Sequence, residues 1–148
     1  MIEAPYWHNV KYMSIGCTHI NSSAIIHLMI TLKLPYPPSV NHYWGQVGSR
    51  KFLGKKGKEF REQVYICSLN ARKGALKGRL HVQVYLYPPD KRKRDIDNVL
   101  KSLLDALEHA YIYENDSQID KLCVERKEVA KDGYCEVTIQ ELIYSPDH

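Results

Sequence analysis

The amino-acid sequence predicts a small α/β (α+β) domain in which a mixed four-stranded sheet carries two main helices. Three observations predict this fold. A chain of 148 residues fits a single domain. Four separate segments alternate apolar and polar residues, as strands do. Two longer segments repeat their apolar residues at the helical period, and together the six segments give the order β-α-β-α-β-β.

The first predicted strand is Met29–Leu34, where apolar and polar residues alternate. Residues 1–28 show no clean period, so we expect an N-terminal extension, disordered or from a non-native start, ahead of a domain over residues 29–148. If Met29 is the natural start, the intact mass of the native protein will be that of a shorter species. Residues 35–44 contain three prolines within four positions and cannot join a central strand, which predicts an extended connector.

Residues 45–54 are predicted to form a loop, and residues 55–72 the first main helix. The apolar residues of this helix recur at spacings of 4, 3 and 4, namely Phe60, Val64, Cys67 and Ala71. Its first turns are rich in lysine, where the helix dipole disfavours cations. That positive charge needs a compensating anion, for which nucleic-acid phosphate, solvent and the nearby glutamates are all candidates.

The second half of the chain begins with a strongly alternating strand over residues 79–87, followed by two prolines that end it. Residues 95–110 form the second main helix, with one broad apolar stripe. Its opposite face carries Asp97, Lys101, Asp105 and Glu108. Residues 118–129 and 134–143 are predicted strands, joined by a hairpin-type turn at Asp132–Gly133.

Charge is distributed unevenly along the chain. The net charge is +4, but residues 50–101 contain 15 Lys and Arg against 5 Asp and Glu, and residues 102–148 contain 4 against 11. A basic middle segment indicates a polyanionic partner on one surface, unless folding mixes the charges again. The four cysteines form no Cys-x-x-Cys pair, which argues against a zinc ribbon and suits a cytoplasmic chain with buried thiols. No segment is long enough and apolar enough to span a bilayer.

Asp95 and Asp97 follow a basic loop and stand two residues apart. Two carboxylates so spaced can share a hard cation such as Mg²⁺, which phosphodiester cleavage requires. The alternative is helix capping, which would account fully for one aspartate. A calcium hand is excluded, because its central glycine and later ligand positions are missing.

Lys101 lies on the same helix face as Asp97, either as its ion-pair partner or as a cation beside metal carboxylates. Asp116 lies in a polar turn after the helix, and it meets the first carboxylates only if the chain folds back. On spacing alone, Glu114 and Asp120 are equally good third ligands.

The plainest nucleic-acid feature is the basic loop, which suits salt-sensitive contact with phosphates but could also be a solvated loop. Two further basic clusters, Arg50–Lys51 and the lysines at the start of the first main helix, favour the phosphate interpretation. The residues expected to bind DNA are Lys91, Arg92, Lys93, Arg94, Arg50, Lys51, Lys55, Lys56 and Lys58.

Four motifs together resemble the RusA-like Holliday junction resolvases. They are the segment 34–43 (Leu-Pro-Tyr-Pro-Pro-Ser-Val-Asn-His-Tyr), the segment 89–98 (Pro-Asp-Lys-Arg-Lys-Arg-Asp-Ile-Asp-Asn), Lys101 with residues 104–107 (Leu-Asp-Ala-Leu), and residues 116–119 (Asp-Ser-Gln-Ile). The resemblance covers about residues 29–141, and the basic-Asp-x-Asp-Asn-x-x-Lys stretch is its most specific part.

The resemblance implies a homodimeric, Mg²⁺-dependent endonuclease, with Mn²⁺ as an expected substitute, that nicks four-way DNA junctions symmetrically in recombination and repair. It assigns Asp95, Asp97 and Asp116 as the essential acids and Lys101 as the essential lysine. It implies no membrane and no small-molecule cofactor, and family members are often carried by prophages. A non-catalytic branched-DNA-binding protein and a general metal-dependent flap or single-strand nuclease remain the alternatives.

Overall fold

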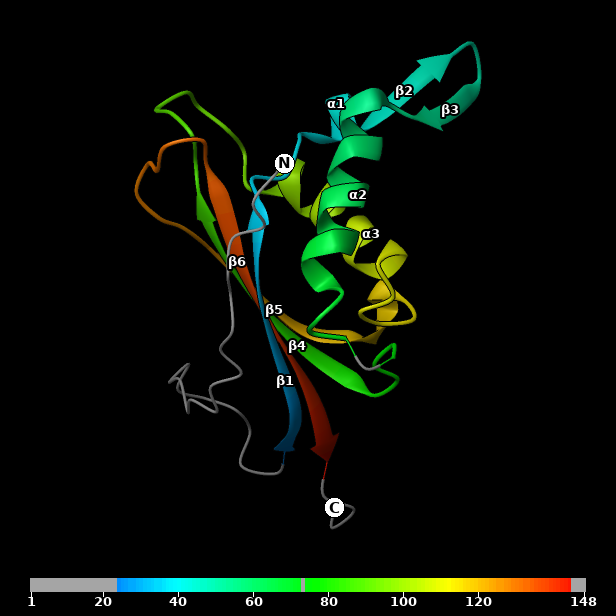
Figure 1. Ribbon diagram of the computed structural model, residues 1–148, viewed down its shortest axis with the longest axis vertical. Helices are drawn as coiled ribbons and strands as arrows, with labels where there is room; N and C mark the ends of the chain where they lie inside the picture. Colours follow the sequence, from blue (N-terminus) through cyan, green and yellow to red (C-terminus); the bar gives the residue numbers. More distant parts are fainter. Residues whose placement is uncertain (1–23, 73, 145–148) are drawn as a thin grey trace.

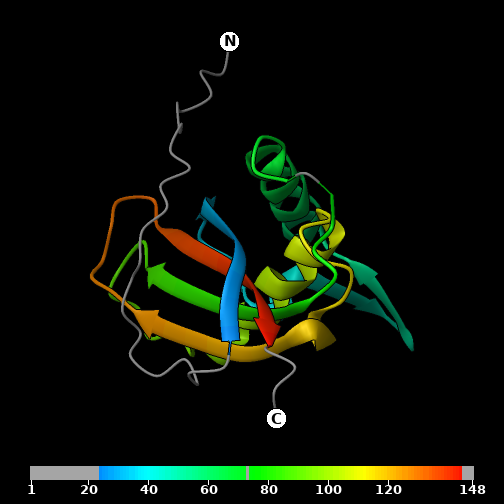
Figure 2. The ribbon, with the colours of Figure 1, turned by 90° about the horizontal axis from the view of Figure 1, so that it is seen from below.

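A four-stranded mixed sheet forms one layer of the protein, and helices cover one of its faces (Figures 1 and 2). The computed structural model describes residues 24–72 and 74–144. The strands are β1 (Ala24–Pro35), β4 (Arg79–Tyr87), β5 (Ile119–Arg126) and β6 (Tyr134–Tyr144), in the order β1-β6-β4-β5. The predicted fold class is confirmed. Strand β1 begins five residues before Met29, so the expected boundary after residue 28 falls inside it, and residues 1–23 lie outside the described part of the chain.

Strand β4 is one of the two interior strands of the sheet and spans the residues that the alternation predicts. It pairs parallel with β5 and antiparallel with β6. Its four apolar residues on one face are fully or almost fully buried, namely Leu80, Val82, Val84 and Leu86. The inward side chains of β1 and β6 continue this apolar surface across the sheet.

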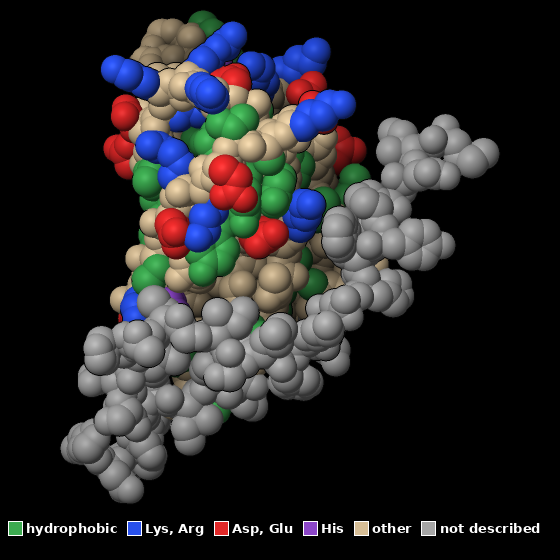
Figure 3. Space-filling view, turned by 90° about the vertical axis from the view of Figure 1, so that its left-hand side faces the viewer, with side chains coloured by type: hydrophobic (Ala, Val, Ile, Leu, Met, Phe, Trp, Pro, Cys, Tyr) green, Lys and Arg blue, Asp and Glu red, His purple; other side chains and the backbone are tan. Residues whose placement is uncertain are grey.

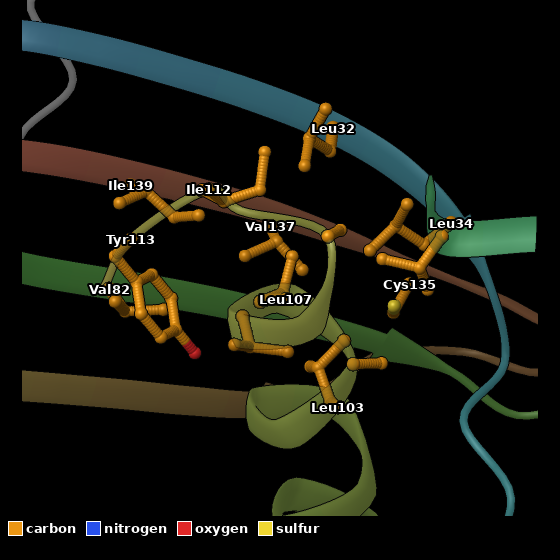
Figure 4. Packing of buried hydrophobic residues seen from close by; sticks show 14 of the residues in the cluster. Leu32, Leu34, Val82, Leu103, Leu107, Ile112, Tyr113, Cys135, Val137 and Ile139 are labelled. Carbon is orange, nitrogen blue, oxygen red and sulfur yellow. The ribbon is translucent and has the colours of Figure 1, made fainter. Parts of the chain in front are cut away.

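The main helices α2 (Lys55–Ser68) and α3 (Asp97–His109) lie on that apolar face. Figure 4 shows Leu103 and Leu107 of α3 facing Val82, Val137 and Ile139 of the sheet. Burial of these side chains holds α3 in place, which in turn fixes the direction of its polar face. Helix α2 is shorter than predicted and buries Phe60, Val64 and Ser68, whereas Cys67 is exposed, so the expected contribution of Cys67 to the apolar stripe is wrong.

The segment before α2 is more ordered than predicted. The connector ends in a short helix, α1 (Val40–Tyr43), and the expected loop is a two-stranded hairpin of β2 (Trp44–Val47) and β3 (Arg50–Leu53). The sequence did not reveal these elements because each has only four residues, which is too short for a detectable period. The prolines and glycines around them also favoured the prediction of a connector and a loop. The connector is fastened to α3 by Ser102, whose Oγ donates to the carbonyl of Pro38 at 2.6 Å.

The predicted hairpin between the last two strands is wrong. Asp132 and Gly133 do form a turn with positive φ angles, as expected. The strands that they connect are not neighbours, however, because β4 lies between β5 and β6. Parallel pairing of β5 with β4 satisfies the same apolar alternation, so alternation alone could not distinguish the two arrangements.

None of the described helices covers the other face of the sheet (Figure 1). Figure 3 views the molecule from that side and shows acidic, basic and hydrophobic side chains interspersed, with several Lys and Arg gathered near the top. None of the described helices is long and apolar enough to cross a membrane.

Candidate active site and nucleic-acid surface

Asp95 and Asp97 stand, both exposed, where the chain enters α3. The N-cap position is Ile96, and no side chain makes a capping hydrogen bond there. Side-chain capping therefore does not account for the pair of aspartates. Asp97 lies in the first turn, where the helix dipole favours a negative charge.

The chain folds back after α3 and brings Asp116 to Lys101. Lys101 Nζ and Asp116 Oδ2 are 3.6 Å apart. The reversal depends on Tyr111, whose φ is 59°, and on Tyr113, whose buried hydroxyl donates to the carbonyl of Leu104 at 2.7 Å. Lys101 lies one helical turn after Asp97, so the polar face of α3 joins the first carboxylates to Asp116.

The two rival acids have other partners. Asp120 forms an ion pair with Arg79, and Glu114 lies 3.9 Å from Lys77. Of the three candidates, Asp116 is the one whose carboxylate lies within ion-pair distance of Lys101 in the described part of the chain. The fold thus places Asp116 beside Lys101, and its role as the third metal ligand stays a prediction.

Two side chains that the sequence did not single out as site residues hold the Asp116 turn. The Glu108 carboxylate accepts the backbone N–H of Asp116 at 3.2 Å. The amide of buried Gln118 uses all four of its hydrogen bonds: Oε1 accepts the N–H groups of Glu114 and Asn115 at 2.9 and 2.8 Å, and Nε2 donates to the carbonyls of Leu76 and Gly78 at 2.9 Å each. The turn is therefore fastened both to α3 and to the segment before β4.

The proposed acids supply only carboxylate oxygens, which is the donor chemistry that Mg²⁺ prefers. Their side chains, however, do not converge on one point. Within residues 24–72 and 74–144, no three His, Cys, Asp or Glu side chains lie close enough together to hold one ion. The donor set fits the metal in kind, and Asp116 in this conformation faces Lys101.

A groove of about 650 Å³ adjoins Asp95. The basic loop lines it with Arg92, Lys93 and Arg94, and α2 contributes Lys56. Asp95 and Asn98 also line it, at the start of α3. The fold therefore brings two of the three predicted basic clusters to one groove, beside one of the predicted acids.

Asp90 organises the basic loop. Its Oδ1 accepts hydrogen bonds from Arg94 Nη1 at 2.6 Å and from the backbone N–H of Arg92 at 2.9 Å. The Arg94 guanidinium, followed by this N–H, holds the pKa of Asp90 down to about 2. Arg94 is thus partly occupied within the loop, whereas Lys91, Arg92 and Lys93 have exposed side chains.

The remaining predicted DNA contacts do not line this groove. Arg50 and Lys51 lie on β3 and are exposed. Lys55 and Lys58 are exposed on the first turn of α2, where Lys55 lies 4.0 Å from Glu59. At 90% side-chain exposure for Lys55, this pair restrains the lysine little.

Comparison with known proteins gives consistent matches. The family model of Endodeoxyribonuclease RusA matches residues 35–140. The chain is 40% identical over 110 residues to the crossover junction endodeoxyribonuclease rusA of Enterobacteria phage HK97, covering 74% of this chain and 92% of the relative. It is 32% identical over 113 residues to the crossover junction endodeoxyribonucleases RusA of Shigella sonnei (strain Ss046) and Escherichia coli (strain K12), covering 76% of this chain and 94% of each relative.

Proposed function

The chain belongs to the RusA family of endodeoxyribonucleases, and from this premise we propose that it is a crossover junction endodeoxyribonuclease that resolves four-way DNA junctions with Mg²⁺. The assignment to particular residues rests on one observation. Lys101, which shares helix α3 with Asp97, lies 3.6 Å from Asp116. This contact joins two residues that have 14 others between them in the sequence.

In this proposal Asp95, Asp97 and Asp116 hold the cation. When bound, Mg²⁺ would offset the charge of the scissile phosphate and make water a better nucleophile. Lys101 keeps a positive charge beside the acids, so that the three carboxylates repel one another less and the phosphate meets a cation at the site. Glu108 and Gln118 hold the turn that carries Asp116 through hydrogen bonds to its backbone.

We propose a homodimer as the active form. A four-way junction has two strands to be nicked symmetrically, and a two-fold symmetric protein presents one site to each. Nicking of both strands by one assembly is also what paired products require.

The test uses a synthetic mobile four-way junction, linear duplex and flap DNA, each incubated with Mg²⁺ or with chelator. Paired symmetric nicks in the junction alone, lost in chelator, are the expected result. Junction binding without nicks would instead favour a non-catalytic branched-DNA-binding protein. Comparable cutting of all three substrates would favour a general metal-dependent flap or single-strand nuclease.

The exposed lysines of the basic loop lead to a prediction about salt. Replacing Lys91 and Lys93 by alanine should weaken junction binding and reduce the slope of log K against log salt by about 0.9 for each lost phosphate contact. The measurement is fluorescence anisotropy of a labelled junction over a salt series. Lys121→Ala, on β5 and paired with His81 of β4, is the control and should leave the slope unchanged. An unchanged slope in the loop variant would remove this loop from the contact surface.

A further inference from the structure

The hairpin of β2 and β3 projects away from the body of the protein (Figures 1 and 2). Each strand has four residues, so the hairpin extends about 13 Å. Gly48 opens its two-residue turn with a φ of 59°, a conformation that favours glycine. The Gln46 amide donates to the Gly48 carbonyl at 2.8 Å, which helps to keep the tip ordered.

The two faces of the hairpin differ. Trp44 pairs with Leu53 on one face, and both pack against the core. On the other face Val47 pairs with Arg50 and Gly45 with Phe52. Val47 is 71% and Phe52 48% exposed, so this face presents two apolar side chains to solvent with a guanidinium beside them. The Phe52 ring lies over Gly45, where a Cβ at residue 45 would come within 2.4 Å of it.

A partly buried polar network holds the base of the hairpin. Tyr43, which directly precedes β2, is fully buried and donates its hydroxyl hydrogen bond to Asp105 of α3. Arg61 of α2 donates to the same carboxylate at 2.7 Å and to the Tyr43 hydroxyl at 2.8 Å, and its guanidinium lies 5.8 Å from the centre of the Trp44 ring. Burial and the hydrogen bond to Asp105 raise the pKa of Tyr43, so it remains a donor. The hairpin is thus fastened to both main helices.

Its position is at the rim of the groove. His42, two residues before β2, lines the groove, and so does Lys56, three residues after β3. No acidic residue occurs between Trp44 and Lys58, whereas five basic residues do, counting Lys58. A partner that meets this apolar face must therefore also accept strong positive charge, which suits DNA better than a second copy of the same basic surface.

We propose that the hairpin is a wedge that enters the branch point of the DNA junction. This inference rests on the proposed function. Val47 and Phe52 would pack against the bases where stacking is interrupted, while Arg50 and Lys51 contact the flanking phosphates. The wedge favours branched DNA over linear duplex, because a continuous stack must first be opened at a free-energy cost that the branch point has already met.

The experiment places 2-aminopurine at the branch point of a synthetic four-way junction and follows its fluorescence as protein binds in chelator. Wild-type protein should raise the fluorescence by unstacking the base. Val47→Ser and Phe52→Ser should remove most of that rise and should each reduce the preference for junction over duplex by about tenfold, the effect of losing one base contact. Ile66→Ser, at a 57% exposed position on α2, is the matched control and should behave as wild type.

Three results would overturn the wedge. The hairpin variants could unstack the base as wild type does, could lose affinity for junction and duplex equally, or could change the oligomeric state in sedimentation while leaving DNA preference intact. A wild-type protein that shows no preference for junctions would overturn the proposed function instead, so the two failures are distinguishable.

Discussion

Asp97→Asn should abolish junction cleavage and leave junction binding nearly unchanged. The substitution keeps the shape of the side chain and removes the charge that a cation needs. Loss of a metal ligand removes several kcal/mol of transition-state stabilisation, so we expect cleavage to fall by about a thousandfold or more. Asp97 is exposed and no hydrogen bond of its side chain caps the helix, so folding should be little affected.

The measurement pairs single-turnover cleavage in Mg²⁺ with anisotropy of the same labelled junction in chelator. Asp120→Asn is the matched control, because this acid was an equal candidate on spacing and forms an ion pair with Arg79. It should cut at close to the wild-type rate. Near wild-type cutting by Asp97→Asn would show that the metal site is assigned wrongly. Loss of cutting by Asp120→Asn would show that Asp120, and not Asp116, is the third ligand.

The sequence predicted the elements that depend on long periodic patterns. Strand β4 has the predicted bounds, and α3 begins two residues later than expected because Asp95 and Ile96 precede its first turn. Pairing partners were harder to predict. A strand with one apolar face can pair parallel or antiparallel, and the turn at Asp132–Gly133 suggested the wrong neighbour for β6.

The candidate site likewise contains residues that local sequence could single out and residues that only the fold brings to it. Asp95, Asp97 and Lys101 could be proposed together because they lie within one short segment at the start of α3. Asp116 could not be chosen over Glu114 by spacing, since its position depends on the reversal at Tyr111 and on long-range hydrogen bonds. Asp105 and Glu108 were visible on the polar face of α3, but their partners Arg61 and Asp116 come from other elements.

Gln118→Ala should destabilise the fold and disable the Asp116 turn together. The substitution removes four hydrogen bonds from a side chain that is only 8% exposed. At about 1 kcal/mol for each net hydrogen bond, the free energy of unfolding should fall by about 2–4 kcal/mol, measured by urea denaturation. Gln63→Ala, at an exposed position on α2, should change it by less than about 0.5 kcal/mol.

A second variant separates the effect of Gln118→Ala on cleavage from its effect on stability. Val137→Ala, in the core below α3, should destabilise the fold by a similar amount without touching Asp116. At a temperature where both variants are folded, Gln118→Ala should cut the junction poorly and need more Mg²⁺ for half-maximal activity, while Val137→Ala should cut normally. Equal activity of the two variants would mean that Gln118 only stabilises the fold.

Gln118→Glu sharpens this test, because it keeps the acceptor and replaces the donor with a second oxygen facing two carbonyls. Burial and those carbonyls favour the protonated acid, so its pKa in the folded state should lie above that in the unfolded chain. A folded state that binds the extra proton gains stability as pH falls and loses it as pH rises through the folded pKa. The deficit of Gln118→Glu relative to wild type should therefore be smaller at acidic pH, whereas that of Gln118→Ala should not depend on pH. A pH-independent deficit in both variants would show that the donor bonds to Leu76 and Gly78 do not hold the turn.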